Sequence, residues 1–231
     1  MKEAHKTIAG KSNFKLKVWL NRIFWSILLL LIAYYLYRAF YFRFTKEGLG
    51  PTFWNKQFWY VFHIATAVPI ILIGPLQFWD WFRKRYMKWH RLLGKIYVIG
   101  ALLGGISAFY LAITIQFPES VIPLMLLSSL WMLMTVFAWI AIKKKNVQAH
   151  RLFMIRSYTL ALSFIFVRIL SDLVEKHNFL SFISNSEVKA ATYEWGSWVV
   201  PLLVVEFFIS WLPSMQLMKV KKPNPMKEQN L

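Results

Sequence analysis

Long apolar stretches, separated by short polar and basic segments, dominate the pattern of the chain. A helix needs about 20 mostly apolar residues to cross the hydrocarbon layer of a bilayer. Six stretches approach or exceed this length, and they predict membrane-spanning helices at residues 19–41, 58–79, 92–115, 121–142, 152–170 and 198–218. The sequence therefore predicts an all-α, polytopic integral membrane protein.

A few ionisable side chains interrupt the predicted spans. An ionisable group at the centre of a membrane helix costs about 2.5–3.5 kcal/mol on insertion scales, so each one needs a physical reason. Arg156 lies near the start of the fifth span, and Arg168 near its end is expected to pair with Asp172, four residues later. Glu206 in the sixth span could be a proton or cation site, the partner of a buried arginine, or a paired carboxylate that locks helix packing.

The charge distribution predicts the orientation of the spans. The chain has 231 residues, of which 58% are hydrophobic and 16% charged, with a formal net charge of +18. With the amino terminus inside, 21 of the 28 Lys and Arg residues fall on the cytoplasmic side. The sequence thus predicts a basic cytoplasmic tail at 1–18, an outer loop at Ser171–Ser197 and a disordered cytoplasmic tail at 219–231. These cations are expected to face anionic lipid headgroups and not nucleic acid.

An internal repeat links two of the predicted cytoplasmic bends. Residues 83–92 match residues 143–152 at an offset of 60, with a basic triplet, a His-Arg pair and a Leu in common. Both bends join helical hairpins that run in the same direction through the membrane. Spans two to five are therefore expected to form a four-helix core with an approximate two-fold axis, flanked by spans one and six. The axis would bring His90 and His150 to equivalent positions.

Several motifs occur together and in a fixed order along the chain. They are His63, Gly74-Pro75-x-Gln77-Phe78, His90-Arg91-x-x-Gly94-Lys95-x-Tyr97 and His150-Arg151-x-x-Met154-Ile155-Arg156-Ser157-Tyr158. As a set, and over roughly residues 58 to 210, they resemble the bacterial membrane-protein family catalogued as domain of unknown function 2306, which usually also has Arg and Glu at the positions of Arg168 and Glu206. The resemblance implies the architecture and a bacterial cytoplasmic membrane, and it implies no activity.

The paired histidines carry the most specific functional hypothesis. Neutral imidazole is a common axial ligand of b-type haem, and membrane haem proteins often hold the iron between histidines of two helices. His90 and His150 are therefore candidate ligands of haem b or a metal, and nearby cations would favour neutral imidazole and pair with haem propionates. His63 is a weaker candidate, because no histidine in the fourth span could partner it. The shallow position of His90 in the membrane argues against a haem site, because His90 precedes the apolar run at Ile96 by six residues, or about 9 Å.

Two other classes of function are compatible with the sequence. Arg91, Arg151 and Arg156, close to two helix starts, could bind an anion or a lipid phosphate, as in a lipid-binding scaffold subunit with membrane partners. Alternatively, Arg156, Arg168 and Glu206 could line the path of a transporter or channel. Cysteine is absent, which excludes disulfides, thiolate catalysis and cysteine-ligated iron–sulfur clusters.

Overall fold

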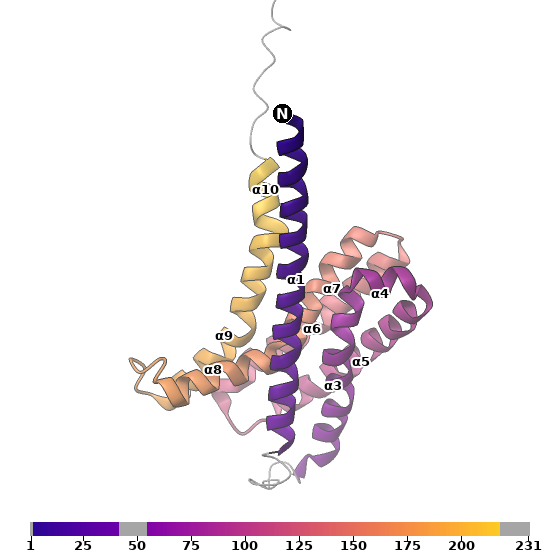
Figure 1. Cartoon of the computed structure of the whole chain (residues 1–231). Coiled ribbons are helices and arrows are strands. Elements are labelled where there is room, and N and C mark those ends of the chain that lie inside the picture. The colour runs from indigo at the N-terminus through magenta and orange to yellow at the C-terminus, as the bar shows by residue number, and fades with distance from the viewer. Residues whose placement is uncertain (1, 42–54, 218–231) are drawn as a thin grey trace, which may run out of the picture.

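The computed structural model describes residues 2–41 and 55–217, and the described residues form helices and connecting turns without any strand (Figure 1). In chain order the helices are α1 (Lys2–Tyr41), α3 (Gln57–Phe78), α4 (Asp80–Arg85), α5 (Met87–Ile113), α6 (Pro118–Lys143), α7 (Val147–Ala161), α8 (Ser163–His177), α9 (Ser186–Glu206), the π-helical η2 (Phe207–Trp211) and α10 (Leu212–Leu217). The predicted all-α class is confirmed. The tail expected at 219–231 lies outside the described residues.

The length and surface of the helices are those of a membrane protein. Five helices are long and apolar enough to span a membrane, and a sixth span results if the bent pair α7–α8 counts as one. Large apolar side chains point outward, as shown by Leu30, which is 71% exposed, and Phe208, which is 61% exposed. Lipid chains would cover such a surface. Exposure of large apolar side chains to water on so many helices would be energetically unfavourable. The chain is thus a polytopic membrane protein, as predicted.

Four helices form the core of the molecule. Helix α3 packs along α5, α5 along α6, and α6 along α7, and a smaller contact between α7 and α3 closes the ring. Helices α5 and α7 therefore lie diagonally opposite each other. Helix α1 contacts α8, and α9 packs against α6, α7 and α8 outside the ring. This arrangement confirms the predicted four-helix core with flanking helices.

The 60-residue repeat extends from the sequence into the packing of the core. The hairpin α3–α5 corresponds to the hairpin α6–α7, so α5 and α7 are equivalent helices. Tyr97 of α5 and Ser157 of α7 are exactly 60 positions apart, and their side-chain oxygens lie 3.0 Å from each other in the buried centre. Equivalent positions can meet only near a symmetry axis. The contact therefore supports the approximate two-fold axis that the repeat predicts.

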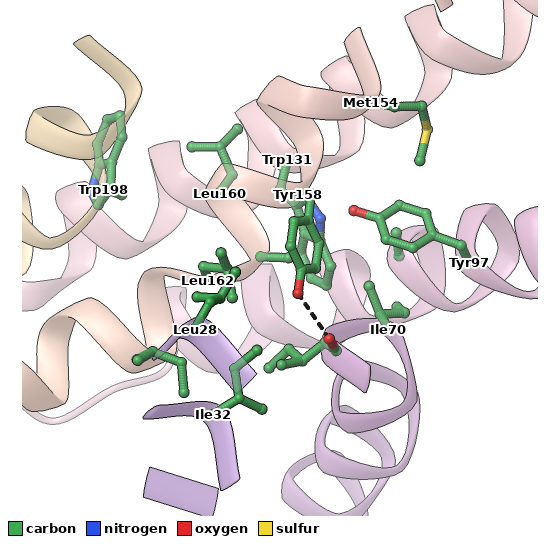
Figure 2. Close-up of a cluster of buried hydrophobic side chains, with 14 of the residues drawn as sticks. Leu28, Ile32, Ile70, Tyr97, Trp131, Met154, Tyr158, Leu160, Leu162 and Trp198 are labelled. Carbon is green, nitrogen blue, oxygen red and sulfur yellow. Dashed lines mark hydrogen bonds between the residues drawn. The ribbon is translucent and has the colours of Figure 1, made fainter. Parts of the chain in front are cut away.

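The contact between α3 and α7 depends on one glycine. The Tyr158 hydroxyl donates a hydrogen bond of 2.9 Å to the Ile71 carbonyl oxygen, as Figure 2 shows within the buried cluster. This bond holds the tyrosine ring over Gly74, where an added Cβ would lie only 2.0 Å from a ring carbon. Any larger residue at 74 would have to displace the ring. The absence of a side chain there lets the bulky Tyr158 fill the space between the two helices.

The predicted fifth span at 152–170 is not a straight helix. The chain bends by about 40° between α7 and α8, at Leu162. Helix α7 stays in the core, while α8 runs sideways relative to α1 (Figure 1). Helix α8 also carries ionic groups such as Arg168, Asp172 and Lys176 along its length. The bend lets this polar helix leave the packed centre, where those groups could not be solvated.

The sixth span also differs from its predicted bounds of 198–218. Helix α9 begins at Ser186, where the Asn185 side chain accepts hydrogen bonds from the backbone N–H groups of Glu187 and Val188. Together with η2 and α10 it forms an apolar helical stretch from Ser186 to Gln216. Much of the outer loop expected at 171–197 is therefore helical. The charged residues of the first turns of α9 gave this segment the hydropathy of a loop.

Both hairpin bends lie at the same end of the molecule. Helix α4 connects α3 to α5, and residues 144–146 connect α6 to α7; in Figure 1 both connections lie toward the end that also holds the start of α1 and α10. The basic segment expected as a separate tail at 1–18 is helical from Lys2 onward and continues into α1. The start of α1 and the end of α10 thus lie toward the same end of the molecule as the two bends.

Candidate functional site

His150 lies at the end of the first turn of α7 and is held in one orientation. Asn146 caps this helix by accepting a hydrogen bond of 3.0 Å from the Ala149 N–H group. The Nδ1 atom of His150 lies 2.9 Å from the backbone carbonyl oxygen of Ala138 in α6. A carbonyl oxygen can only accept, so Nδ1 carries the hydrogen, and Nε2 of the neutral ring keeps a free lone pair. Metal-ligating histidines are commonly oriented by this type of bond.

His90 occupies the equivalent position on the first turn of α5. Its side chain is half-buried, and its Nδ1 atom is buried without a hydrogen-bond partner among the described residues. His90 and His150 come close enough to interact electrostatically, and Arg83 and Arg91 are also within electrostatic reach of His90. The two repeat-related histidines thus lie on diagonal helices of the ring, within electrostatic reach of each other.

A chain of hydroxyl groups lies two helical turns beyond the histidines. The Thr135 hydroxyl donates to the Trp131 carbonyl oxygen over 2.8 Å, which makes it the acceptor for Ser157, 2.8 Å away. Ser157 in turn accepts from Tyr97 over 3.0 Å. All three hydroxyl groups are buried, and each has a partner. The chain crosses the bundle from α5 through α7 to α6 with every donor in one direction.

Two buried donors beside this chain have no partner within the described structure. They are Nε2 of Gln77, on the last turn of α3, and the indole Nε1 of Trp131, on α6. The Gln77 side chain packs near Gly94, one turn after His90. A buried N–H group without a partner costs about 1–3 kcal/mol, so most such groups in native proteins are satisfied by protein, water or a ligand. The ring of four helices therefore contains a spare hydrogen-bond donor, Gln77 Nε2, close to the start of α5, where His90 lies; the Trp131 indole lies deeper, beside the Tyr97 hydroxyl.

The three arginines expected to form an anion site separate into two kinds. The side chains of Arg91 and Arg151 are exposed. Arg156 instead forms an ion pair with Glu206, through Nε to Oε1 and through Nη2 to Oε2 at 2.9 Å. Its Nη2 atom also donates to the Ser210 hydroxyl over 3.0 Å.

Glu206 thus has the arginine partner that was one of its expected roles. Ser210 completes the contact by donating a hydrogen bond of 2.8 Å to Glu206 Oε2. It belongs to η2, the π-helical turn that follows Glu206 directly. The wider turn places the Glu206 carboxylate and the Ser210 hydroxyl where the Arg156 guanidinium contacts both. The pair connects the outer helix α9 with the core.

Asp172 does not form its main contact with Arg168, and the expected pair was wrong in this respect. Its described ionic partners are Arg38 of α1 and Lys176, and it also accepts a hydrogen bond of 3.2 Å from Tyr35. The guanidinium carbon of Arg168 lies 5.4 Å from the centre of the Phe164 ring. The Asp172 carboxylate binds Arg38, which is far from it in the sequence. The spacing of residues along a single helix cannot predict such a partner. The Asp172 contact joins α1 to α8.

His63 lies far from the other two histidines of the core. Its Nδ1 atom lies 3.0 Å from the Gly104 carbonyl oxygen and 3.3 Å from the Ser107 hydroxyl oxygen. It precedes Gln77 by 14 residues on the same helix, which corresponds to about 21 Å along the axis. In the part of the chain that the structure describes, no three His, Cys, Asp or Glu side chains gather as a multi-ligand metal site would require. His63 therefore holds α3 against α5.

The hydroxyl chain and the spare donors were not identified from the sequence. The signal for Ser157 was present, because it follows Tyr97 by the 60 residues of the repeat. Nothing in the sequence pointed to Thr135 or to the indole of Trp131, since Ser, Thr and Trp are common in membrane helices. Only the packing of the ring brings these groups together.

The comparisons with known proteins agree with this architecture. Residues 60–209 match the family model described as predicted membrane protein (DUF2306). No curated protein and no solved structure matched the chain. The matched segment begins in α3, includes α5, α6 and α7 with both histidines of the pair, and ends within η2 beyond Glu206. The chain therefore belongs to the DUF2306 family of predicted membrane proteins.

Proposed function

We propose that the protein is a membrane electron-transfer protein that holds one b-type haem between His90 and His150. The observation that carries the proposal is the orientation of His150, whose Nδ1 is held on the Ala138 carbonyl oxygen, on the helix diagonal to the one that carries its repeat equivalent, His90. Two neutral imidazoles are a complete axial ligand set for haem iron. A metal ion bound by protein alone would require more ligands than this pair provides.

The surroundings of the pair supply the other groups that a haem needs. Haem propionates are anionic, and the Arg83 guanidinium, which also pairs with Asp80, lies within electrostatic reach of His90. The spare N–H group of Gln77 could donate to a propionate or to ordered water. A bound b-type haem would supply one-electron transfer, and the protein would supply the axial ligands, the charges and the shielding from water.

We further propose that the protein lies in a bacterial cytoplasmic membrane with both termini in the cytoplasm. The excess of Lys and Arg on the side of the two hairpin bends supports this orientation. Because the chain lacks cysteine, single cysteines introduced at Asn146 and Ser184 can test it. A membrane-impermeant thiol reagent applied to intact cells should label the cysteine at 184 and not the one at 146. The reverse labelling would contradict the orientation.

Transport remains a hypothesis that no particular observation favours. It relied on Arg156, Arg168 and Glu206 as charges that line a polar path. Arg156 and Glu206 are engaged with each other, and the Arg168 guanidinium lies over an aromatic ring. A role as a scaffold with membrane partner subunits likewise stays a prediction.

The haem proposal can be tested by absorption spectroscopy with matched histidine variants. The protein is purified in mild detergent from cells supplied with a haem precursor, and the reduced-minus-oxidised spectrum is recorded. We expect sharp visible bands of haem b in the parent and in His177→Ala, which removes an exposed histidine at the end of α8. The bands should be lost in His90→Ala and in His150→Ala.

Imidazole added to the two defective variants separates loss of a ligand from loss of the fold. A folded variant should regain the low-spin spectrum when free imidazole replaces the missing side chain. A colourless parent protein would overturn the proposal. So would bands that survive in both His90→Ala and His150→Ala.

A further inference from the structure

The surface between α5 and α6 contains an apolar groove on the outside of the four-helix ring. Its volume is about 300 Å³, and the residues that line it are Lys95, Val98, Ile99, Leu102, Val136 and Trp139. The residues of α5 are spaced by three, one and three positions, which places them on one face of that helix. Those of α6 are spaced by three. The groove therefore runs along both helices.

One end of the groove is positively charged. Lys95 lies at the end of the groove that is closest to the start of α5. Helix α6 runs in the opposite direction and reaches the same end at Lys143, whose Nζ atom lies 5.0 Å from the centre of the Trp139 ring. One lysine thus lies over Trp139, and a second, from the antiparallel helix, lines the same end of the groove. This end is also the side of the membrane on which both hairpin bends lie.

We propose that this groove binds one anionic phospholipid, with an acyl chain along the apolar walls and the phosphate between Lys95 and Lys143. The apolar walls suit part of a hydrocarbon chain, and the cations are where the phosphate of a lipid in that leaflet would lie. Trp139 has the amphipathic ring that is favoured at this depth of a bilayer. The site contains none of the histidines and is independent of the proposed haem.

Lipid binding to the purified full-length protein can be measured by native mass spectrometry. Phosphatidylglycerol and phosphatidylcholine with identical chains are titrated separately against the parent, against Lys95→Gln/Lys143→Gln and against Leu102→Trp. The control is Lys84→Gln/Lys88→Gln, which removes two exposed cations from the same side of the protein without touching the groove. Size-exclusion chromatography and circular dichroism check that each variant is folded.

The proposal predicts tighter binding of phosphatidylglycerol than of phosphatidylcholine by the parent. Replacement of one groove lysine should raise the dissociation constant for phosphatidylglycerol about fivefold, and replacement of both about thirtyfold, because a basic side chain near an anionic membrane contributes about 1 kcal/mol. Leu102→Trp should weaken binding of phosphatidylglycerol without any change in charge. Equal binding of the two lipids by the parent would overturn the proposal, as would a control variant as weak as the groove variant.

Discussion

Removal of either partner of the Arg156–Glu206 ion pair is expected to destabilise the protein strongly, whereas removal of both is not. The two side chains are 17% and 21% exposed, so most of each charged group is shielded from solvent. In Glu206→Leu, the Arg156 guanidinium loses its bond to Oε1 and its 2.9 Å bond to Oε2. In Arg156→Leu, the Glu206 carboxylate keeps only the hydroxyl of Ser210.

The size of the effect follows from the cost of an unpaired charge. Breaking a buried pair by removing one partner typically costs about 3–5 kcal/mol. The partial exposure of both groups places this pair at the lower end, so each single variant should lose about 3 kcal/mol in the free energy of unfolding. Replacement of both partners by leucine leaves no charge behind and should cost no more than about 1 kcal/mol. The coupling energy would then reach several kcal/mol, more than surface pairs provide.

The four proteins of this double-mutant cycle can be compared by SDS titration in mixed micelles, with circular dichroism as the signal. Arg151→Leu serves as the control, because it removes an exposed arginine from the same helix, and it should change stability by less than about 0.5 kcal/mol. If the double variant loses as much stability as the two single variants together, the pair does not hold α9 against the core. The contact would then be one between two independently solvated groups.

Two further substitutions test the packing of the core. Gly74→Ala should destabilise the protein by about 1–3 kcal/mol, because its Cβ would meet the Tyr158 ring. Gly196→Ala, where the nearest atom lies at 3.4 Å, should be tolerated, and equal melting temperatures for the two variants would contradict the role of Gly74. Ser157→Ala should cost about 1–3 kcal/mol, since it leaves the buried Tyr97 hydroxyl unpaired. Unchanged unfolding in SDS titration would contradict a continuous hydroxyl chain.

The spans that the sequence predicted well are the ones that are apolar throughout. Helices α3, α5 and α6 contain the predicted spans almost entirely, because nothing in them resembles a loop. The bend at Leu162 was missed because it lies inside a segment apolar enough to be taken as one straight span. The early start of α9 was missed because its first turns contain charged residues, and hydropathy alone assigns such a segment to a loop.

The candidate site was predictable only as far as the repeat extends. An offset of 60 residues identified His90 and His150 as equivalent, and in the structure they lie within electrostatic reach of each other. The same offset applied to Tyr97 would have found Ser157. The pairing of Arg156 with Glu206 and of Arg38 with Asp172 could not be predicted, because each pair joins helices far apart in the sequence. Such contacts depend on how the outer helices rotate against the core.

The haem content of the purified protein decides whether the paired histidines form one haem site. It can be measured by the pyridine haemochrome assay, set against the protein concentration from amino-acid analysis. We expect one b-type haem per chain, because His63 lies against α5 without a histidine partner in the described structure. A value near zero, from cells with an ample supply of haem, would contradict the site at His90 and His150. A value near two would contradict the claim that only one site exists.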